Sequence, residues 1–151
     1  SCLVGSEMCI RDRCKTIYLI CNKTPFLRFD ADVEIEIDTG PEVITGSTRM
    51  KAGTATKMAL NMISTTCMIK LGKVYGNLMV DLMAVNDKLV DRGTRIIMQL
   101  TSLSYDDSLQ ALKNAQMSVK TALVMIIDRC DLNQARERLK QENGNLRNII
   151  Q

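Results

Sequence analysis

Residues 46–54, GSTRMKAGT, combine side chains that can bind an anion such as phosphate. The hydroxyls of Ser47 and Thr48 can donate hydrogen bonds to phosphate oxygens, and the guanidinium of Arg49 can add a two-pronged contact. Lys51 supplies a second positive charge close by. The pattern predicts an anion-binding site formed by these four side chains. It is neither a Walker A loop nor a dinucleotide-binding glycine motif, so nucleotide binding is disfavoured.

The charges in this segment conflict with the helix that is expected to follow it. Apolar and small residues recur at threes and fours over residues 48–71, which predicts a helix with Arg49 and Lys51 in its first turn. The start of a helix already carries positive character, so each cation there costs from a few tenths to about 1 kcal/mol. The sequence contains no acidic residue between Glu42 and Asp81, so the only nearby residues that could compensate these cations are Glu42 and Asp38. A bound anion would resolve the conflict.

A structural explanation competes with the anion-binding hypothesis. Serine and threonine are common helix N-caps, so Ser47 or Thr48 can cap the helix while Arg49 and Lys51 extend into water. Under this explanation Glu42 is a surface carboxylate of the loop. The pattern alone does not separate the two explanations.

Histidine is absent from the chain, which removes catalysis by Ser-His-Asp or Cys-His groups and argues against a zinc site. A catalyst built on this sequence would use carboxylates, lysines or tyrosines as acid and base. Glu34 and Glu36 are expected on the solvated face of a strand, whereas paired catalytic carboxylates need a cleft. Because the chain has no histidine, no metal site is expected.

The composition argues against two other kinds of partner. Aromatic residues make up 3% of the chain, so bases would find few stacking platforms, and the net charge of +3 is too small to imply a polyanion. No apolar run approaches the roughly 18 residues of a membrane helix, and no signal-peptide pattern is visible. Neither a nucleic-acid partner nor a membrane is expected. The six cysteines show no C-x-x-C spacing and are expected to be reduced thiols of a cytoplasmic protein.

Two strands are expected to precede the anion-binding segment. Residues 15–21, KTIYLIC, form a short apolar and β-branched run, typical of a parallel strand buried on both faces. Residues 31–38, ADVEIEID, alternate apolar with acidic side chains, which predicts a strand with one solvated face near the edge of a sheet. Gly72 is the expected end of the helix that follows the loop, and Met62, Met68 and Met79 are expected to fill the core.

The remaining sequence is expected to be helical. Residues 77–85, NLMVDLMAV, are interpreted as an apolar helix, and Asn86 as the N-cap of a helix over residues 87–100. Short amphipathic helices are expected from Ser104 onward. Ser104 and Asp131 each open one of them, because each is followed three residues later by an acidic or amide side chain that suits a capping box.

Two stretches of this C-terminal region are similar to each other. LKNAQMSVKTAL, which starts at Leu112, aligns with LKQENGNLRNII, which starts at Leu139. Each copy predicts a helix end, a polar turn and a basic residue that opens the next apolar helix. Because there are only two copies, the pattern favours a small helical subdomain over a solenoid.

The longest motif of the chain resembles a known family. GPEVITGSTRMKAGTATKMALNMIST, followed by MIKLGKVYGNLMVDL, is similar to the C-terminal half of the N-acetylmuramic acid 6-phosphate etherase family. The similarity runs from about Lys15 to the end of the chain and is most specific over residues 40–81. The glucokinase regulatory protein, a sugar-phosphate sensor that is not an enzyme, is more distantly similar in the same loop.

The resemblance implies a fold and a reaction. The fold is α/β, a partial sugar isomerase (SIS) αβα sandwich with a parallel sheet over residues 15–103, followed by a small helical subdomain over residues 104–151. The reaction is the removal of D-lactate from N-acetylmuramic acid 6-phosphate to give N-acetylglucosamine 6-phosphate, by elimination and then water addition. It needs no cofactor and belongs to peptidoglycan recycling by a cytoplasmic enzyme, which is expected to be a homodimer.

The resemblance also implies which residues bind the substrate and which are missing. Ser47, Thr48, Arg49 and Lys51 would contact the phosphosugar. The family's catalytic glutamates lie in its N-terminal half, so no catalytic residue is assigned in this chain, and Glu42 receives no role. The alternative function is a non-catalytic sugar-phosphate-binding regulator.

Two stretches depart from the family. Residues 1–13, SCLVGSEMCIRDR, resemble translated sequencing-adapter sequence, so an artefactual or disordered leader is expected over residues 1–14. The chain is accordingly interpreted as a fragment that is inactive alone. The first copy of the C-terminal repeat reads AQMS where the family tends to have glycine and asparagine, which leaves the geometry of that turn open.

Overall fold

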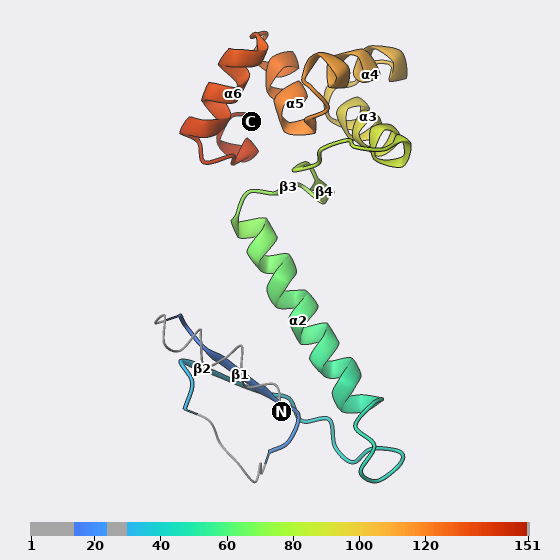
Figure 1. Cartoon of the computed structure of the whole chain (residues 1–151), viewed down its shortest axis with the longest axis vertical. Coiled ribbons are helices and arrows are strands. Elements are labelled where there is room, and N and C mark those ends of the chain that lie inside the picture. Colours follow the sequence, from blue (N-terminus) through green and yellow to red (C-terminus); the bar gives the residue numbers. More distant parts are fainter. Residues whose placement is uncertain (1–13, 24–29, 151) are drawn as a thin grey trace. The chain divides into compact units, whose positions relative to one another are not determined.

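The computed structural model describes residues 14–23 and 30–150 (Figure 1). The expectation for residues 1–13 lies outside the described part of the chain. The contacts divide the chain into two compact units, Ser1–Ser64 and Thr65–Gln151, and the boundary falls within the longest helix, α2 (Lys51–Lys70). The predicted boundary between a SIS part and a helical subdomain at residue 104 stays a prediction.

The first unit contains a two-stranded parallel sheet. Strand β1 (Ile17–Ile20) pairs with β2 (Val33–Glu36), and Ile17 lies opposite Val33. The parallel pairing predicted for the first strand is thereby confirmed. Its predicted burial on both faces is wrong, because Ile17 is 53% exposed. The reason is that the described part of the unit gives β1 only one neighbouring strand.

Helix α2 ends where the sequence predicts and begins slightly later than expected. Gly72 has a φ of +68°, and its amide donates a hydrogen bond of 3.0 Å to the carbonyl oxygen of Ile69. Glycine adopts this left-handed conformation without the steric cost of a Cβ, which confirms Gly72 as the terminator. At the other end the helix begins at Lys51, because residues 48–50 form a turn.

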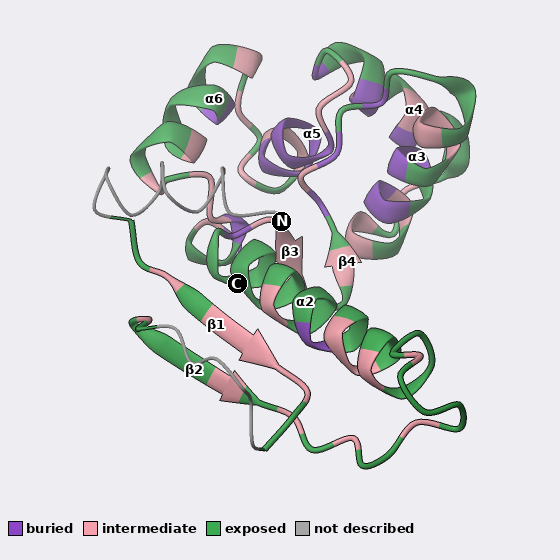
Figure 2. Ribbon diagram, turned by 60° about the horizontal axis from the view of Figure 1, so that its bottom comes forward, coloured by how far each residue is buried: buried purple, intermediate pink, exposed green. Residues whose placement is uncertain are grey.

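Most residues of α2, including most of its large apolar residues, are exposed, and the ribbon of the helix is largely in the colour of exposed residues in Figure 2. The prediction that Met62, Met68 and Met79 fill the core is wrong, since these residues are 62%, 46% and 46% exposed. Ala59 is the buried residue of the helix. Apolar residues lie on every side of α2, whereas a helix with one covered face needs only an apolar stripe.

A β-hairpin replaces the start of the helix that the sequence predicts over residues 77–85. Strand β3 (Val74–Tyr75) pairs antiparallel with β4 (Leu78–Met79) across a Gly-Asn turn, in which Gly76 has a φ of +58°. The rest of the predicted helix is extended or irregular chain. The helix prediction fails because a short apolar run does not distinguish a strand from a buried helix, and because a two-residue Gly-Asn loop favours a hairpin.

The second unit continues as a series of helices that begin at the predicted caps. The side chains of Asn86, Ser104 and Asp131 each accept a hydrogen bond from the backbone amide three residues later. Asp131 also forms the predicted capping box with Gln134. These cap predictions are confirmed. The helices are α3 (Asp87–Thr101), α4 (Tyr105–Asn114), α5 (Val119–Ile127), α6 (Leu132–Gln141) and the 3₁₀ helix η1 (Leu146–Asn148).

The core of the second unit lies where α3, α4 and α5 pack together, and Figure 2 shows the buried residues gathered on these helices. Ile97, Leu112 and Leu123 are fully buried there. Gly93 allows α3 to approach its neighbours closely, because a Cβ at this position would lie 2.9 Å from Cγ2 of Val119. A larger residue at this position would push the helices apart.

The two similar C-terminal stretches share an unusual backbone geometry. Each contains two consecutive residues with positive φ, followed by a side-chain N-cap, Ser118 in the first copy and Asn145 in the second. The polar turn predicted for both copies is confirmed. The second copy then opens the 3₁₀ helix η1 where an α-helix was expected. The left-handed residues are Gln116, Met117, Asn143 and Gly144, with φ angles of 53°, 65°, 51° and 72°.

Candidate functional site

The predicted anion-binding residues lie in the loop between β2 and α2, wholly within the first unit. The amide of Ser47 donates a hydrogen bond of 3.0 Å to the carbonyl oxygen of Ile44, which forms a turn. The amide of Gly53 donates a hydrogen bond of 2.9 Å to the carbonyl oxygen of Thr48. These bonds form the turns that hold Ser47, Thr48 and Arg49, which lie two to four residues before the first residue of α2.

The carboxylate of Glu42 caps the start of α2. Its Oε2 accepts a hydrogen bond of 3.0 Å from the amide of Lys51, and its Oε1 accepts one of 3.0 Å from the amide of Ala52. The bonds from Ala52 and Lys51 lower the pKa of Glu42 below its ordinary value. A negative charge at this end of a helix also interacts favourably with the helix dipole. The loop therefore supplies its own anion to the cationic helix start.

This cap resolves the charge conflict differently from both explanations drawn from the sequence. Among the described residues, no hydroxyl of Ser47 or Thr48 accepts a hydrogen bond from the start of α2. Glu42 is engaged and is not a free surface carboxylate, and it occupies two amides that an external anion would otherwise use. Sequence reasoning missed this role. The sequence signal that could have indicated it is that Glu42 is the last acidic residue before a long stretch that contains no Asp or Glu.

Lys51 directs its ammonium back to the loop. Its Nζ donates a hydrogen bond of 2.7 Å to the carbonyl oxygen of Pro41, the residue before Glu42. Both the backbone and the side chain of Lys51 therefore hold the base of the loop. Its predicted contact with a substrate stays a prediction, and this bond competes with it.

The other three predicted residues keep their side-chain donors available. Within the part of the chain that the structure describes, no acceptor binds the hydroxyl of Ser47, the hydroxyl of Thr48 or the guanidinium of Arg49. Thr48 and Arg49 are exposed, and Ser47 is half-buried. Three neighbouring donors without a protein acceptor suit a ligand rich in oxygen atoms.

Arg49 lines an open hollow of about 640 Å³ beside the start of α2. Lys51 also lines it, but most of the lining is apolar. The other lining residues are Thr39, Met50, Thr54, Ala55 and Met58. Another hollow of the first unit is lined by Asp32 and a second carboxylate, which would repel an anion. Of these two hollows, the one at Arg49 has cationic side chains, Arg49 and Lys51, on an otherwise mainly apolar wall.

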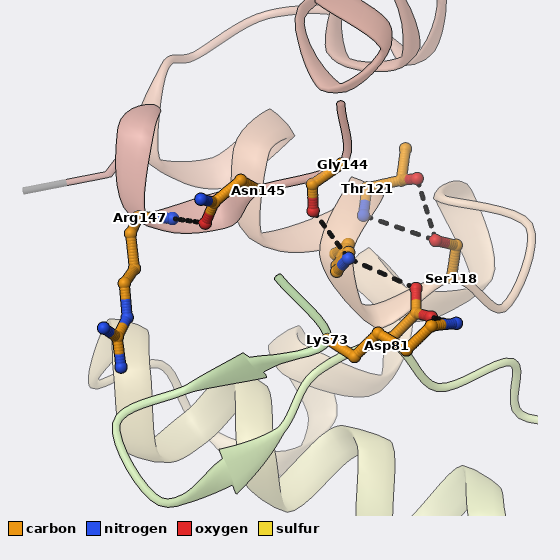
Figure 3. A network of polar contacts seen from close by, with 8 residues as sticks. Lys73, Asp81, Ser118, Thr121, Gly144, Asn145 and Arg147 are labelled. Carbon is orange, nitrogen blue, oxygen red and sulfur yellow. Dashed lines mark hydrogen bonds and ion pairs between the residues drawn. The ribbon is translucent and has the colours of Figure 1, made fainter. Parts of the chain in front are cut away.

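A second polar cluster lies within the second unit (Figure 3). The carboxylate of Asp81 forms ion pairs with two ammonium groups, that of Lys73 at 2.6 Å and that of Lys120 at 3.3 Å. Lys120 also donates a hydrogen bond of 2.6 Å to the carbonyl oxygen of Gly144. Burial raises the pKa of Asp81, but the interactions with Lys73 and Lys120 outweigh it and lower the pKa overall. The charged groups satisfy one another, so the cluster fastens the turn at Gly144 and offers no free group for chemistry.

Other kinds of site find no support in the described ranges. No cluster of three or more metal-ligating side chains occurs among residues 14–23 and 30–150. In the same ranges, no helix combines the length and the apolar character needed to cross a membrane. The described cysteines are free thiols, and Cys2 and Cys9 lie outside the described residues. These free thiols are Cys14, Cys21, Cys67 and Cys130.

The sequence is similar to curated bacterial enzymes. It is 48% identical over 133 residues to N-acetylmuramic acid 6-phosphate etherase of Geobacillus thermodenitrificans, covering 88% of this chain and 45% of the relative. It is 49% identical over 135 residues to the etherase of Mycolicibacterium smegmatis, covering 89% and 45%. The match to the etherase of Pectobacterium atrosepticum is 46% identical over 149 residues, covering 98% and 49%. No protein-family model matches the chain.

The chain is an α/β protein with a small parallel sheet and a loop of free donors before a long helix. Over most of its length it is similar to N-acetylmuramic acid 6-phosphate etherases, of which it matches the C-terminal part, so the resemblance drawn from the sequence is confirmed. The chain spans 45% of the length of the first of these relatives. The match over 98% of the chain also reaches into residues 1–13, whose interpretation stays a prediction.

Proposed function

We propose that this chain contributes to a carbon–oxygen lyase that cleaves the D-lactyl ether of N-acetylmuramic acid 6-phosphate. The products would be N-acetylglucosamine 6-phosphate and D-lactate, in the recycling of peptidoglycan and amino sugars. The observation that carries the proposal is the 48% identity over 133 residues to a relative named for this etherase activity. Because the chain spans only 45% of that relative, we propose that it is inactive alone.

In this proposal the loop of Ser47, Thr48 and Arg49 contacts the phosphosugar. The guanidinium of Arg49 pairs with the phosphate, because its planar fork matches two phosphate oxygens. The two hydroxyls donate to phosphate or sugar oxygens. Lys51 contributes positive charge while its ammonium stays on the carbonyl oxygen of Pro41, at 2.7 Å. The support for this arrangement is that three donors of one loop lack an acceptor among the described residues.

The bond-breaking step is not assigned to this loop. Its free donors can hold an anion, whereas the elimination needs a group that removes a proton from carbon 2 and a group that protonates the leaving oxygen. We infer that glutamates in the part of the etherases that this chain does not match perform these transfers. No cofactor is required by such acid–base chemistry.

We also infer that the described elements belong to a larger SIS sandwich. The parallel pair β1 and β2, followed by α2, is compatible with part of such a sheet and one of its covering helices. The apolar surface of α2 supports this inference, because a helix that is apolar on all sides is normally buried. The whole protein would be a cytoplasmic homodimer, with the SIS part over residues 15–103 and the helical subdomain over residues 104–151.

Release of D-lactate from N-acetylmuramic acid 6-phosphate by the whole protein tests the proposed function. We expect equal amounts of D-lactate and N-acetylglucosamine 6-phosphate to form. Binding of the phosphosugar without release of D-lactate would contradict the lyase and favour a non-catalytic regulator. A whole protein that neither binds the phosphosugar nor releases D-lactate from it would rule out a phosphosugar function.

A further inference from the structure

We propose that Glu42 is a positioning residue of the phosphosugar site, which fastens the loop that presents Ser47, Thr48 and Arg49 to the ligand. The inference rests on the proposed function, because it concerns the same site. The resemblance to the etherases assigns no role to Glu42, and the role follows from the contacts at the start of α2.

Three hydrogen bonds close the base of the loop, and we call them the clasp. The two carboxylate oxygens of Glu42 accept bonds of 3.0 Å from the amides of Lys51 and Ala52, and the carbonyl oxygen of Pro41 accepts one of 2.7 Å from Nζ of Lys51. The clasp therefore joins two pairs of consecutive residues. All residues of the loop lie between these pairs, so the conformation of the loop depends on the clasp.

The clasp also decides which groups can receive a phosphate. Two consecutive amides at a helix start attract an anion, but the carboxylate of Glu42 already occupies those of Lys51 and Ala52. A ligand phosphate is therefore left to side-chain donors. Arg49 is the strongest of these, because it is charged, lines the open hollow and has no partner in the described chain.

Glu42 is poorly suited to transfer a proton. Both of its oxygens accept backbone hydrogen bonds, and these bonds hold the pKa of the carboxyl below its ordinary value. The group is therefore ionised and engaged near neutral pH, whereas an effective general acid needs a pKa close to the working pH. Its contribution to the site is geometric.

Because Glu42 is negatively charged, the direction in which its neutralisation changes phosphosugar binding distinguishes a positioning role from mere proximity to the site. A carboxylate that merely stood near the site would repel a phosphate, so its neutralisation would strengthen binding. Glu42→Gln keeps the size of the side chain but leaves only one acceptor for two amides. If Glu42 positions the loop, this change weakens binding even though a negative charge is lost.

Titration calorimetry of the whole protein with N-acetylglucosamine 6-phosphate measures this change without turnover, because the ligand is the product of the proposed reaction. We expect the Kd to rise about tenfold in Glu42→Gln, since small displacements of binding groups have large effects. The matched control Glu34→Gln removes the same charge from an exposed position of β2 and should leave the Kd unchanged or slightly lower. An unchanged or lower Kd in Glu42→Gln would overturn the proposal.

The amide signals of Lys51 and Ala52 give a readout that needs no ligand. In the whole protein labelled with ¹⁵N-lysine and ¹⁵N-alanine, both signals should shift together as Glu42 titrates below its ordinary pKa of 4.5, and Glu42→Gln should abolish the shift. If the two signals do not shift in this pH range, the carboxylate of Glu42 does not bind these amides and the proposal is overturned. If they titrate but the wild-type protein binds no phosphosugar, the proposed function is wrong and Glu42 is a helix cap only.

Discussion

The ammonium of Lys120 donates a hydrogen bond of 2.6 Å to the carbonyl oxygen of Gly144, and this bond joins the two similar stretches of the second unit. Lys120 lies in the first copy and Gly144 in the left-handed turn of the second. The Lys120 side chain is only 10% exposed, and Asp81 balances its charge at 3.3 Å. Because a buried ammonium is costly unless it is paired, this contact fixes the arrangement of the C-terminal turn.

Replacement of Lys120 should therefore destabilise the second unit. Lys120→Met removes the donor from the carbonyl oxygen of Gly144 and one partner from Asp81, so we expect the free energy of unfolding to fall by about 1–3 kcal/mol. Lys88→Met is the control, because Lys88 is exposed in the first turn of α3, and its effect should stay within about 0.5 kcal/mol. Urea unfolding measures both changes. Equal effects of the two substitutions would contradict the assignment.

Asp81 should make the stability of the second unit depend on acid pH. Burial raises its pKa, but the interactions with Lys73 and Lys120 lower it overall from the ordinary value of 3.8. The folded carboxyl then binds fewer protons than the unfolded one, so its stabilisation is present above pH 3.8 and is lost as the pH falls through the folded pKa. The slope of the free energy of unfolding against pH in this range should be smaller in Asp81→Asn. Identical slopes in the two proteins would count against this prediction.

Gly93→Ala should be destabilising, against the usual preference of helices. In an exposed helix, alanine in place of glycine stabilises by about 1 kcal/mol. At this position the added Cβ would lie 2.9 Å from Cγ2 of Val119 and 3.3 Å from Cδ2 of Leu112. Overpacking of this kind costs about 1–3 kcal/mol, so thermal and urea unfolding should both show a loss of stability. A stabilised variant would show that α3 does not pack closely here.

An exchange of aligned turn residues tests whether the two copies share one geometry. Gln116 and Asn143 occupy matching places, with φ angles of 53° and 51°. Asparagine tolerates this conformation better than glutamine does. Arg136 donates a hydrogen bond to Oε1 of Gln116, so the exchange is made in an Arg136→Ala background that lacks this bond. There we expect Gln116→Asn to raise the free energy of unfolding by about 0.5 kcal/mol and Asn143→Gln to lower it by a similar amount. If both substitutions changed the free energy of unfolding in the same direction, the result would contradict a turn geometry shared by the two copies.

Local signals predict much of the second unit from sequence alone. The caps Asn86, Ser104 and Asp131 act on amides three residues away, and Gly72 ends α2 through its own left-handed conformation. Such contacts depend on neighbouring residues, so they are visible without knowledge of the packing. The sequence predicts Ser47, Thr48 and Arg49 as candidate ligands for the same reason, because their side-chain chemistry is local.

The features that the sequence does not reveal depend on more distant parts of the chain. Glu42 caps α2 by reaching an amide nine residues later, a separation that no simple cap motif covers. The hairpin at Gly76 depends on pairing between two short runs whose apolar character also fits a helix. The exposure of Met62 and Met68 depends on which elements cover α2, and periodicity within the helix does not specify those elements.

The Michaelis constant of the variant Arg49→Ala tests most directly the claim that the loop of Ser47, Thr48 and Arg49 holds the phosphosugar. In the whole protein we expect the KM for N-acetylmuramic acid 6-phosphate to rise about tenfold or more, because the phosphate loses a charged two-pronged contact. Arg49→Lys should give a smaller rise, since the charge remains but the fork is lost.

Lys57→Ala is the matched control, because it removes an exposed cation from α2 outside the loop. Its KM should stay within about twofold of the wild-type value, because the charge of an exposed side chain is screened by salt. A strong rise in KM for Arg49→Ala alone is the result that we predict. An Arg49→Ala protein that keeps the wild-type KM would contradict the assignment of the phosphosugar site to this loop.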